Sequence, residues 1–309
     1  MAKIPVADAH CDFLYGMYEL RFDIADPEKG QTIYLPYMKQ GGVKLQFFAA
    51  WIDRSLKTPY LQQCLSMIDC YERMLEAHPD AFEKLTKAYS PTGDKIATVL
   101  TVEGGEAIEG SLAALRTLKR LGVSAMTLTW NHHNELAYAA MKRGAKGLTS
   151  LGKEAVAEMN RIGIALDVSH LSDGGIDDAL LISKAPIFAS HSNARAVYDT
   201  PRALCDDHIR AIKKQGGVIG VNFFHKQLCD GDASIRDIVR HMMHVIKIGG
   251  IECCCIGSDF DGMTQYPRDL QNCSYLQDLL GALRAEGLGE EDLYKIAYGN
   301  LYDYIVQFI

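Results

Sequence analysis

One short stretch of the sequence places two metal-binding side chain types two residues apart. Residues 7–12, Ala-Asp-Ala-His-Cys-Asp, follow the apolar run Ile-Pro-Val at residues 4–6. Side chains of an extended strand alternate between its faces, so His10 and Asp12 are expected to point the same way and Cys11 the other. An imidazole beside a carboxylate provides two arms of a chelate for a divalent metal ion.

Further candidate ligands follow the same rule, because each stands at the C-terminal end of an apolar segment. They are Glu103, the run Asn131-His132-His133, His170, His191, Asp259 and Asp261. Three histidines and two carboxylates from separate segments suit two divalent ions, and zinc is the metal most often bound by imidazole-rich sites. A water shared between two cations has its pKa lowered enough to act as a hydroxide nucleophile in amide or ester hydrolysis.

Glu103 is the candidate for a carboxylate that bridges the two ions. It stands in Val-Glu-Gly-Gly, where the glycines allow the backbone to pass close to a metal cluster. The alternative bridge is a carbamylated lysine, but no lysine closes any of the early apolar segments. His132 or His133 can act as the electrophilic partner of the acyl oxygen.

Two further residues are candidates for substrate recognition. Asp259 can bind a substrate ammonium or pass a proton to the leaving amine. Arg202 has two readings: a loop arginine paired with Asp206 or Asp207, or a bidentate clamp for a substrate carboxylate.

Other polar residues receive simpler predictions. Asp167 and Asp173 flank His170 and are candidates to orient its ring. His208 is expected at the surface, and His241 on a solvated or half-buried helix face.

Apolar segments alternate with helix-like segments along the whole chain. The segment after Thr149, for example, places Leu151, Ala155, Met159 and Ile162 on one helical stripe, with Thr149 or Ser150 as N-cap. The predicted strands cover residues 4–9, 43–52, 96–102, 125–130, 164–169, 187–190, 218–223 and 253–257. Eight such alternations predict a closed (β/α)8 barrel of the TIM type formed by residues 1–309 as a single domain, with a doubly wound open sheet as the alternative. In a barrel the C-terminal strand ends converge on one mouth, where all the candidate ligands would meet.

The composition excludes several classes of function. The 309 residues are 48% hydrophobic and 23% charged, with a net charge of −7 and no basic patch, which argues against a nucleic-acid or membrane partner. No apolar run approaches the roughly 20 residues of a membrane span, and the N-terminus lacks a signal-peptide core, so a cytoplasmic protein is expected. The nine cysteines have no Cys-x-x-Cys spacing and are expected to be reduced.

With these residues assembled, the sequence resembles the membrane (renal) dipeptidase family, the M19 metallopeptidases, and its soluble bacterial branch. The resemblance runs from about residue 5 to residue 300. Six motifs match in order: Asp8-Ala-His-Cys-Asp12; Glu103-Gly-Gly; the segment from Gly147-Leu-Thr to Asp167-Val-Ser-His170; Ser190-His-Ser192; the segment from Arg202 to Asp206-Asp207; and Gly257-Ser-Asp-Phe-Asp-Gly262.

The resemblance implies a (β/α)8 barrel with two zinc ions per chain. One ion would be held by His10, Asp12 and Glu103, the other by Glu103, His170 and His191. It also implies that Arg202 meets the carboxyl end of a dipeptide and Asp259 its amino end. Family members hydrolyse dipeptides, often accept a D-residue at the C-terminal position, and tend to be homodimers.

One position departs from the family pattern. The mammalian form has a histidine directly after Leu-Thr that faces the substrate's carbonyl oxygen, and here that position is Trp130. Either His132 or His133 takes over this catalytic and substrate-binding role, or the electrophile is a different group; we expect His132.

The leading hypothesis is a binuclear zinc dipeptidase acting through a metal-bridging hydroxide. The alternative is a related zinc amidohydrolase that acts on N-acyl amino acids or lactones. A non-catalytic binding protein is disfavoured because every ligand position is intact, and a zinc endonuclease is disfavoured by the acidic balance.

Overall fold

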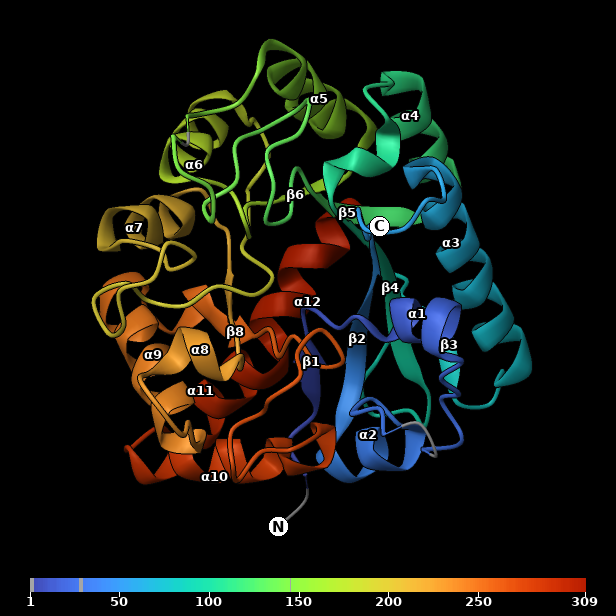
Figure 1. Ribbon diagram of the computed structural model, residues 1–309. Helices are drawn as coiled ribbons and strands as arrows, with labels where there is room; N and C mark the ends of the chain where they lie inside the picture. Colours follow the sequence, from blue (N-terminus) through green and yellow to red (C-terminus); the bar gives the residue numbers. More distant parts are fainter. Residues whose placement is uncertain (1–2, 28–29, 145) are drawn as a thin grey trace.

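The chain folds around a curled sheet of parallel strands (Figure 1). The computed structural model describes residues 3–27, 30–144 and 146–309. Neighbouring strands follow the order β6-β5-β4-β2-β1-β8-β7, and all of these pairs are parallel. The strands are β1 (Val6–Asp8), β2 (Val43–Trp51), β3 (Phe82–Lys84), β4 (Ile96–Glu103), β5 (Val123–Thr127), β6 (Ala165–Asp167), β7 (Ile219–Val221) and β8 (Cys254–Ile256).

Two residues between β6 and β7 close the sheet into a ring. Phe188 forms a parallel bridge with Asp167 of β6, and Ala189 forms one with Ile219 of β7. The Val168 N–H donates to the Phe188 carbonyl at 2.8 Å, and the Ala189 N–H donates to the Val218 carbonyl at 3.0 Å. The (β/α)8 barrel is therefore confirmed over the open doubly wound sheet.

The ring differs from the prediction in its details. The predicted strand 187–190 is reduced to the two bridging residues, and the predicted strand 4–9 is ordered as a strand only over Val6–Asp8. β3, which was not predicted, pairs with β4 outside the ring. That residues 1–309 form a single domain stays a prediction.

Helices surround the strands on the outside of the ring (Figure 1). Thr149 is the N-cap of α5, as predicted, and its hydroxyl accepts a hydrogen bond from the Gly152 N–H. The helices are α1 (Phe13–Tyr15), α2 (Leu35–Gly41), α3 (Tyr60–Ala77), α4 (Leu112–Arg120), α5 (Ser150–Ile162), α6 (Asp173–Ile182), α7 (Asp206–Lys214), α8 (His225–Leu228), α9 (Ile235–Gly249), α10 (Leu276–Ala285), α11 (Glu290–Tyr294) and α12 (Asn300–Ile305).

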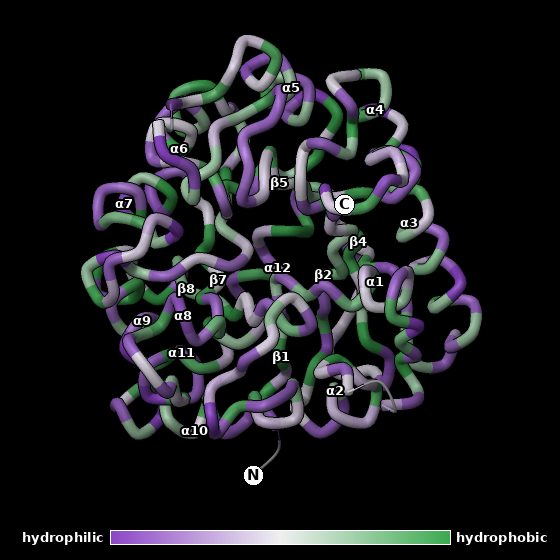
Figure 2. The backbone as a smooth tube through the Cα atoms, viewed as in Figure 1, coloured by the Kyte–Doolittle hydropathy of each residue, from purple (hydrophilic) through white to green (hydrophobic). Residues whose placement is uncertain are grey.

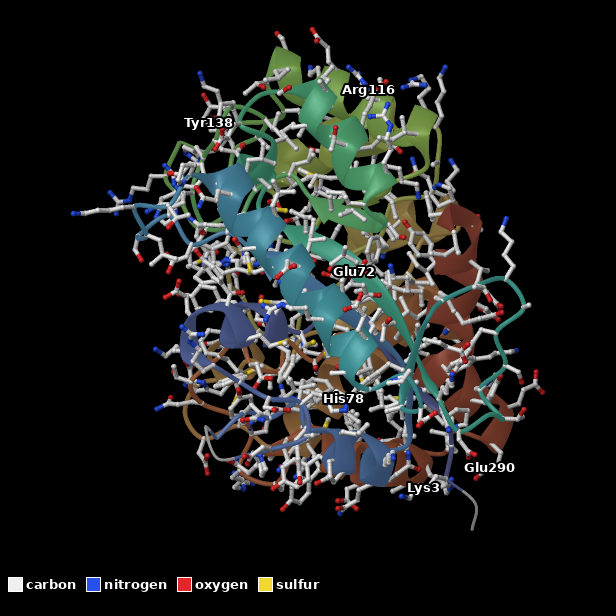
Figure 3. The ribbon with its side chains drawn as sticks, turned by 90° about the vertical axis from the view of Figure 1, so that its right-hand side faces the viewer. Lys3, Glu72, His78, Arg116, Tyr138 and Glu290 are labelled. Atoms are coloured by element: carbon white, nitrogen blue, oxygen red, sulfur yellow. The ribbon has the colours of Figure 1, made fainter. Side chains whose placement is uncertain are left out.

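The outer faces of these helices carry charged pairs. Glu72 on α3 pairs with Lys84 at 2.6 Å, and Arg116 on α4 pairs with Glu158 on α5 at 2.9 Å (Figure 3). Figure 2 shows hydrophobic residues concentrated toward the strands and hydrophilic residues on peripheral helices such as α7. Within the described ranges, no helix is both long enough and apolar enough to cross a membrane.

Two apolar clusters hold the barrel together. The larger lies between the strands and the surrounding helices, and the smaller fills the inside of the ring. Tyr298, Tyr304 and Phe308 from the C-terminal helical segment join the inner cluster, and the Tyr304 ring lies 4.9 Å from the Phe188 ring. The C-terminal segment thus seals one end of the barrel and leaves the other end for the site.

Candidate metal centre

The turn after β1 brings His10 and Asp12 to the same side of the chain. The His10 Nε2 lies 3.6 Å from the Asp12 Oδ2, while the Cys11 Sγ points to the other side and lies 3.2 Å from the Phe47 carbonyl oxygen. Both His10 and Asp12 are buried. The alternation predicted from the sequence is therefore present at this strand end.

Glu103, the last residue of β4, faces ligands on two sides. Its Oε2 lies 3.4 Å from the His10 Nε2, and its Oε1 lies 2.8 Å from the His170 Nε2. The glycines after it are needed for close packing, because a Cβ at Gly105 would stand 2.3 Å from the Leu128 carbonyl oxygen. A carboxylate that presents one oxygen to each side has the geometry of a bridging ligand.

His170 and His191 face each other across the Glu103 carboxylate. Their Nε2 atoms are 2.9 Å apart, and the His191 Nε2 lies 3.4 Å from the Glu103 Oε1. The Nδ1 atoms are engaged elsewhere, that of His170 with the Asn131 Oδ1 at 2.9 Å and that of His191 with the Ser190 Oγ at 2.7 Å. When each Nδ1 carries the ring proton, two nitrogen lone pairs and a carboxylate oxygen converge on one point, which favours a cation there.

Charge and burial in this cluster perturb its acids. Burial, followed by the charge of Glu103, raises the pKa of Asp12 to about 6. Burial raises the pKa of Asp259 to about 7, while burial and then the charge of Arg202 lower the pKa of His170 to about 4. The His10 Nε2 and the Asp12 Oδ1 are buried without a hydrogen-bond partner within the described ranges. Buried polar atoms that converge without partners are the donor set expected of a metal site.

Asp259 lies at the edge of the same cluster. It takes the left-handed conformation, with φ at 65°, and its Oδ1 lies 3.9 Å from the His10 Nε2. Its Oδ2 accepts a hydrogen bond from the Asn222 Nδ2 at 2.9 Å. Ligand atoms of His10, Asp12 and Asp259 lie close enough together to hold one ion, and those of His10, Glu103 and His191 form a second such group.

Arg202 is buried against the histidine shell rather than paired in a loop. Its Nη2 donates to the His191 carbonyl oxygen at 3.3 Å, and its Nε has no hydrogen-bond partner in the described part of the chain. Asp206 instead contacts His244 at 2.7 Å, and Asp207 contacts Arg210 at 2.7 Å. The loop ion pair considered from the sequence is therefore wrong.

A cavity of about 370 Å³ opens beside the cluster. Asp12, Glu103, His170 and Asp259 line its polar side. Aromatic rings line another side, with the Trp51 ring 4.7 Å from Tyr15 and 4.9 Å from Trp130. The cavity can therefore hold a small molecule that carries both charged and apolar groups.

The structure does not bring His132 into this cavity lining. Trp130 and Asn131 line it instead, and the His132 ring lies 5.8 Å from the Trp130 ring. His133 is turned away, because its Nδ1 accepts the Ala139 N–H at 3.0 Å. The role predicted for His132 stays a prediction without a contact that supports it.

Several secondary predictions are corrected. Asp173 forms an ion pair with Arg195 and does not orient His170; the partner of that ring is Asn131, which the sequence marked only as one of three polar residues after a strand. His208 is buried and contacts Asp177 at 3.0 Å. His241 is fully buried, bonded to the Ala194 N–H and the Leu228 carbonyl. Hydrogen bonds made by the backbone of distant segments cannot be read from helical periodicity.

Comparison with known proteins gives one consistent family. The model of the membrane dipeptidase family (Peptidase family M19) matches residues 1–305. Dipeptidase 3 of Rattus norvegicus is 33% identical over 316 residues, which cover 97% of this chain and 64% of the rat protein. A protein of Schizosaccharomyces pombe named as an uncharacterised dipeptidase is 34% identical over 305 residues, which cover 89% of this chain and 73% of that protein.

Solved structures agree over the full chain. A metallopeptidase from Rhodobacter sphaeroides, bound to a phosphinate mimic of the dipeptide L-Ala-D-Ala, has a TM-score of 0.92 at 27% identity, with 100% of both chains covered. A dipeptidase assigned to family M19 has a TM-score of 0.92 at 29% identity, with 99% of both chains covered.

Proposed function

The chain belongs to the membrane dipeptidase family, peptidase family M19, and from this we propose that it is a metal-dependent dipeptidase that hydrolyses the single peptide bond of a dipeptide. The Rhodobacter relative bound to a dipeptide mimic supports a substrate of this size. Tolerance of a D-residue at the C-terminal position is part of the proposal, since that mimic represents L-Ala-D-Ala.

The proposed cofactor is a pair of divalent zinc ions. His10, Asp12 and Glu103 would hold one ion, and Glu103, His170 and His191 the other. The two oxygens of Glu103, which face the histidines on either side, support a bridging role. Ions bound here would polarise the peptide carbonyl and lower the pKa of a water enough to supply the nucleophile.

The burial of Arg202 is the observation that supports a substrate with a free carboxylate. Arg202 is 5% exposed, and its guanidinium forms no ion pair within 4.0 Å in the described ranges. An unpaired buried cation is costly, and a carboxylate bound in bidentate fashion would satisfy it. Arg202 would therefore bind the carboxyl end of the dipeptide.

Asp259 would recognise the other end of the substrate. Asn222 holds its Oδ2, so its Oδ1 is available to an ammonium group or to a proton on its way to the leaving amine. Charges at both ends of the site would restrict the substrate to two residues, because a longer peptide cannot bring both of its termini to these two groups.

The test is hydrolysis of L-Ala-L-Ala and L-Ala-D-Ala, with N-acetyl-L-Ala-L-Ala as the matched substrate that lacks the free amine. We expect two zinc ions per chain, turnover of both dipeptides, and loss of turnover on acetylation or on removal of metal by a chelator. Turnover of the acetylated compound alone would contradict the dipeptidase and favour the amidohydrolase for N-acyl amino acids. Zinc-replete protein that cleaves neither dipeptide would also contradict the proposal.

A homodimer and a cytoplasmic location stay predictions. Light scattering of the purified chain would measure the first, with a mass of twice 34.2 kDa expected.

A further inference from the structure

Asn131 stands between a candidate metal ligand and the cavity. Its Oδ1 lies 2.9 Å from the His170 Nδ1, and the residue lines the cavity beside Trp130. In the described part of the chain, no group accepts a hydrogen bond from its Nδ2, and that atom is not among the buried polar atoms without a partner. The amide nitrogen is therefore open to whatever occupies the cavity.

The state of the His170 ring fixes the direction of the Asn131 amide. The His170 Nε2 faces the Glu103 Oε1 at 2.8 Å and the His191 Nε2 at 2.9 Å, so the ring would bind a cation through Nε2. The ring proton would then reside on Nδ1, which would donate to the Asn131 Oδ1. With its oxygen engaged, Asn131 presents an NH₂ group, which can only donate, to the cavity.

The loop that carries Asn131 is held by its own hydrogen bonds. The Thr129 hydroxyl donates to the carbonyl oxygen of His132. The Asn134 Nδ2 donates to the Leu128 carbonyl at 2.8 Å, and the Asn134 Oδ1 accepts the N–H groups of the two residues 136 and 137. These hydrogen bonds fix the chain on both sides of Asn131, so its amide is already in position before substrate binds.

The neighbouring histidines are less suited to contact a substrate. The His133 ring is committed to the Ala139 N–H and packs 4.5 Å from the Tyr138 ring, which lies at the edge of the molecule in Figure 3. Neither the His132 ring nor the His133 ring lines the cavity that Asn131 lines.

We propose that Asn131 has two roles in the reaction: its oxygen positions His170, and its NH₂ donates a hydrogen bond to the substrate's carbonyl oxygen as negative charge develops there. The second role rests on the proposed dipeptidase function, whereas the first concerns metal binding alone. A fixed donor aimed at a developing oxyanion acts mainly on the transition state, so it should influence kcat more than KM.

Two substitutions separate the roles. Asn131→Asp keeps an oxygen acceptor for the His170 Nδ1–H but removes the NH₂ donor, and Asn131→Ala removes both. Asn160→Asp is the matched control, because the Asn160 Oδ1 accepts the Lys184 N–H near the end of α5, at the opposite end of the barrel from the mouth. Zinc affinity by competition with a chromophoric chelator and steady-state kinetics on L-Ala-L-Ala at saturating zinc are the readouts.

For Asn131→Ala we expect zinc affinity about 10- to 100-fold weaker and kcat about 100-fold lower. For Asn131→Asp we expect near-normal zinc affinity and a kcat also about 100-fold lower, with a small change in KM. Asn160→Asp should match the wild type in both readouts.

Unchanged zinc affinity in Asn131→Ala would overturn the positioning role. A kcat within about threefold of wild type in metal-saturated Asn131→Asp would overturn the donor role. A larger kcat loss in His132→Ala than in either Asn131 variant would also overturn it. Wild-type protein inactive on dipeptides would instead contradict the proposed function, and the zinc affinities would still decide the positioning role.

Discussion

Replacing Arg202 by methionine should weaken substrate binding while making the protein more stable. Arg202 is 5% exposed, its Nε lacks a hydrogen-bond partner in the described part of the chain, and its Nη2 makes one hydrogen bond, to the His191 carbonyl. Burial lowers the pKa of Arg202 from 12.5 to about 10, against the charges of Glu103 and Asp259, which raise it. Methionine has a similar length and carries no charge, so it fills the space without the cost of burying a cation.

The magnitudes follow from these observations. A pKa lowered from 12.5 to about 10 corresponds to about 3 kcal/mol of destabilisation of the charged form. Removing the charge should therefore stabilise the fold by this amount, and losing the hydrogen bond to the His191 carbonyl should offset about 1 kcal/mol of that gain. Arg202→Met should then raise the free energy of unfolding by about 2 kcal/mol. Two charge-assisted bonds to a carboxylate contribute at least about 3 kcal/mol, so KM should rise about 100-fold or more.

Urea unfolding followed by circular dichroism measures the first quantity, and dipeptide kinetics measure the second. Arg202→Lys is the control, because it keeps a cation but loses the bidentate geometry, and it should fall between wild type and methionine in KM. An Arg202→Met protein that is less stable than wild type and has an unchanged KM would refute the reasoning, because the arginine would then be a structural residue.

Two further predictions concern an acid at the mouth and a histidine in the core. Asp259→Asn should lower kcat about 100-fold with two metal ions still bound, because the neutral amide can no longer pair with the substrate ammonium or pass a proton to the leaving amine; a loss of one metal ion by elemental analysis would make Asp259 a ligand instead. His241 is buried and neutral, with its pKa lowered by burial to about 4. In the unfolded chain the pKa of His241 is near its unperturbed value of about 6.5, so between these two pKa values the unfolded chain binds more protons than the folded chain. The free energy of unfolding should therefore fall by about 2 kcal/mol through His241 as pH falls from 7.5 to 5. His241→Gln should reduce that loss in paired urea titrations, where the contribution of the metal-site histidines is common to both proteins; an equal loss in both would contradict the prediction.

The sequence predicted which side chains of the candidate metal centre lie together because that information is carried by strands. Period-two alternation places His10 and Asp12 on one side, and the convergence of parallel strand ends places Glu103 near His170 and His191. Both rules assume regular strands; His10, Asp12, His170 and His191 lie just beyond the strand ends, and their side chains still converge.

The same reasoning does not reach the loop after β5, where loop conformation decides which residue faces the cavity. After β5 the sequence reads Trp130-Asn131-His132-His133, and chemical reactivity favoured a histidine. The bonds of Thr129 and the amide of Asn134 turn the chain so that Trp130 and Asn131 face inward. No periodicity describes such a turn, so only the structure could choose between the neighbours.

Two buried aspartates explain why the strands that carry ligands end so early. β1 ends at Asp8, whose Oδ1 accepts the Ser258 N–H at 2.8 Å and the His10 N–H at 3.4 Å. β6 ends at Asp167, whose Oδ1 accepts the N–H groups of Ser169 at 2.9 Å and of Ser190 at 3.0 Å. In both cases a carboxylate at the strand end takes the place of carbonyl acceptors from the neighbouring strand.

These two carboxylates accept hydrogen bonds from backbone N–H groups that would otherwise have no partner where the chain leaves the sheet. They also tie each ligand-bearing turn to the next strand, since Asp8 joins the turn of His10 to Ser258 and Asp167 joins β6 to the residue before His191. Burial raises the pKa of both Asp8 and Asp167, yet the hydrogen bonds that each accepts favour the charged form. The candidate ligands His10 and His191 therefore sit on turns that buried carboxylates of the barrel hold in place, whereas Asn131 sits on a longer loop whose outside contacts come from side chains such as Arg54 and Glu106.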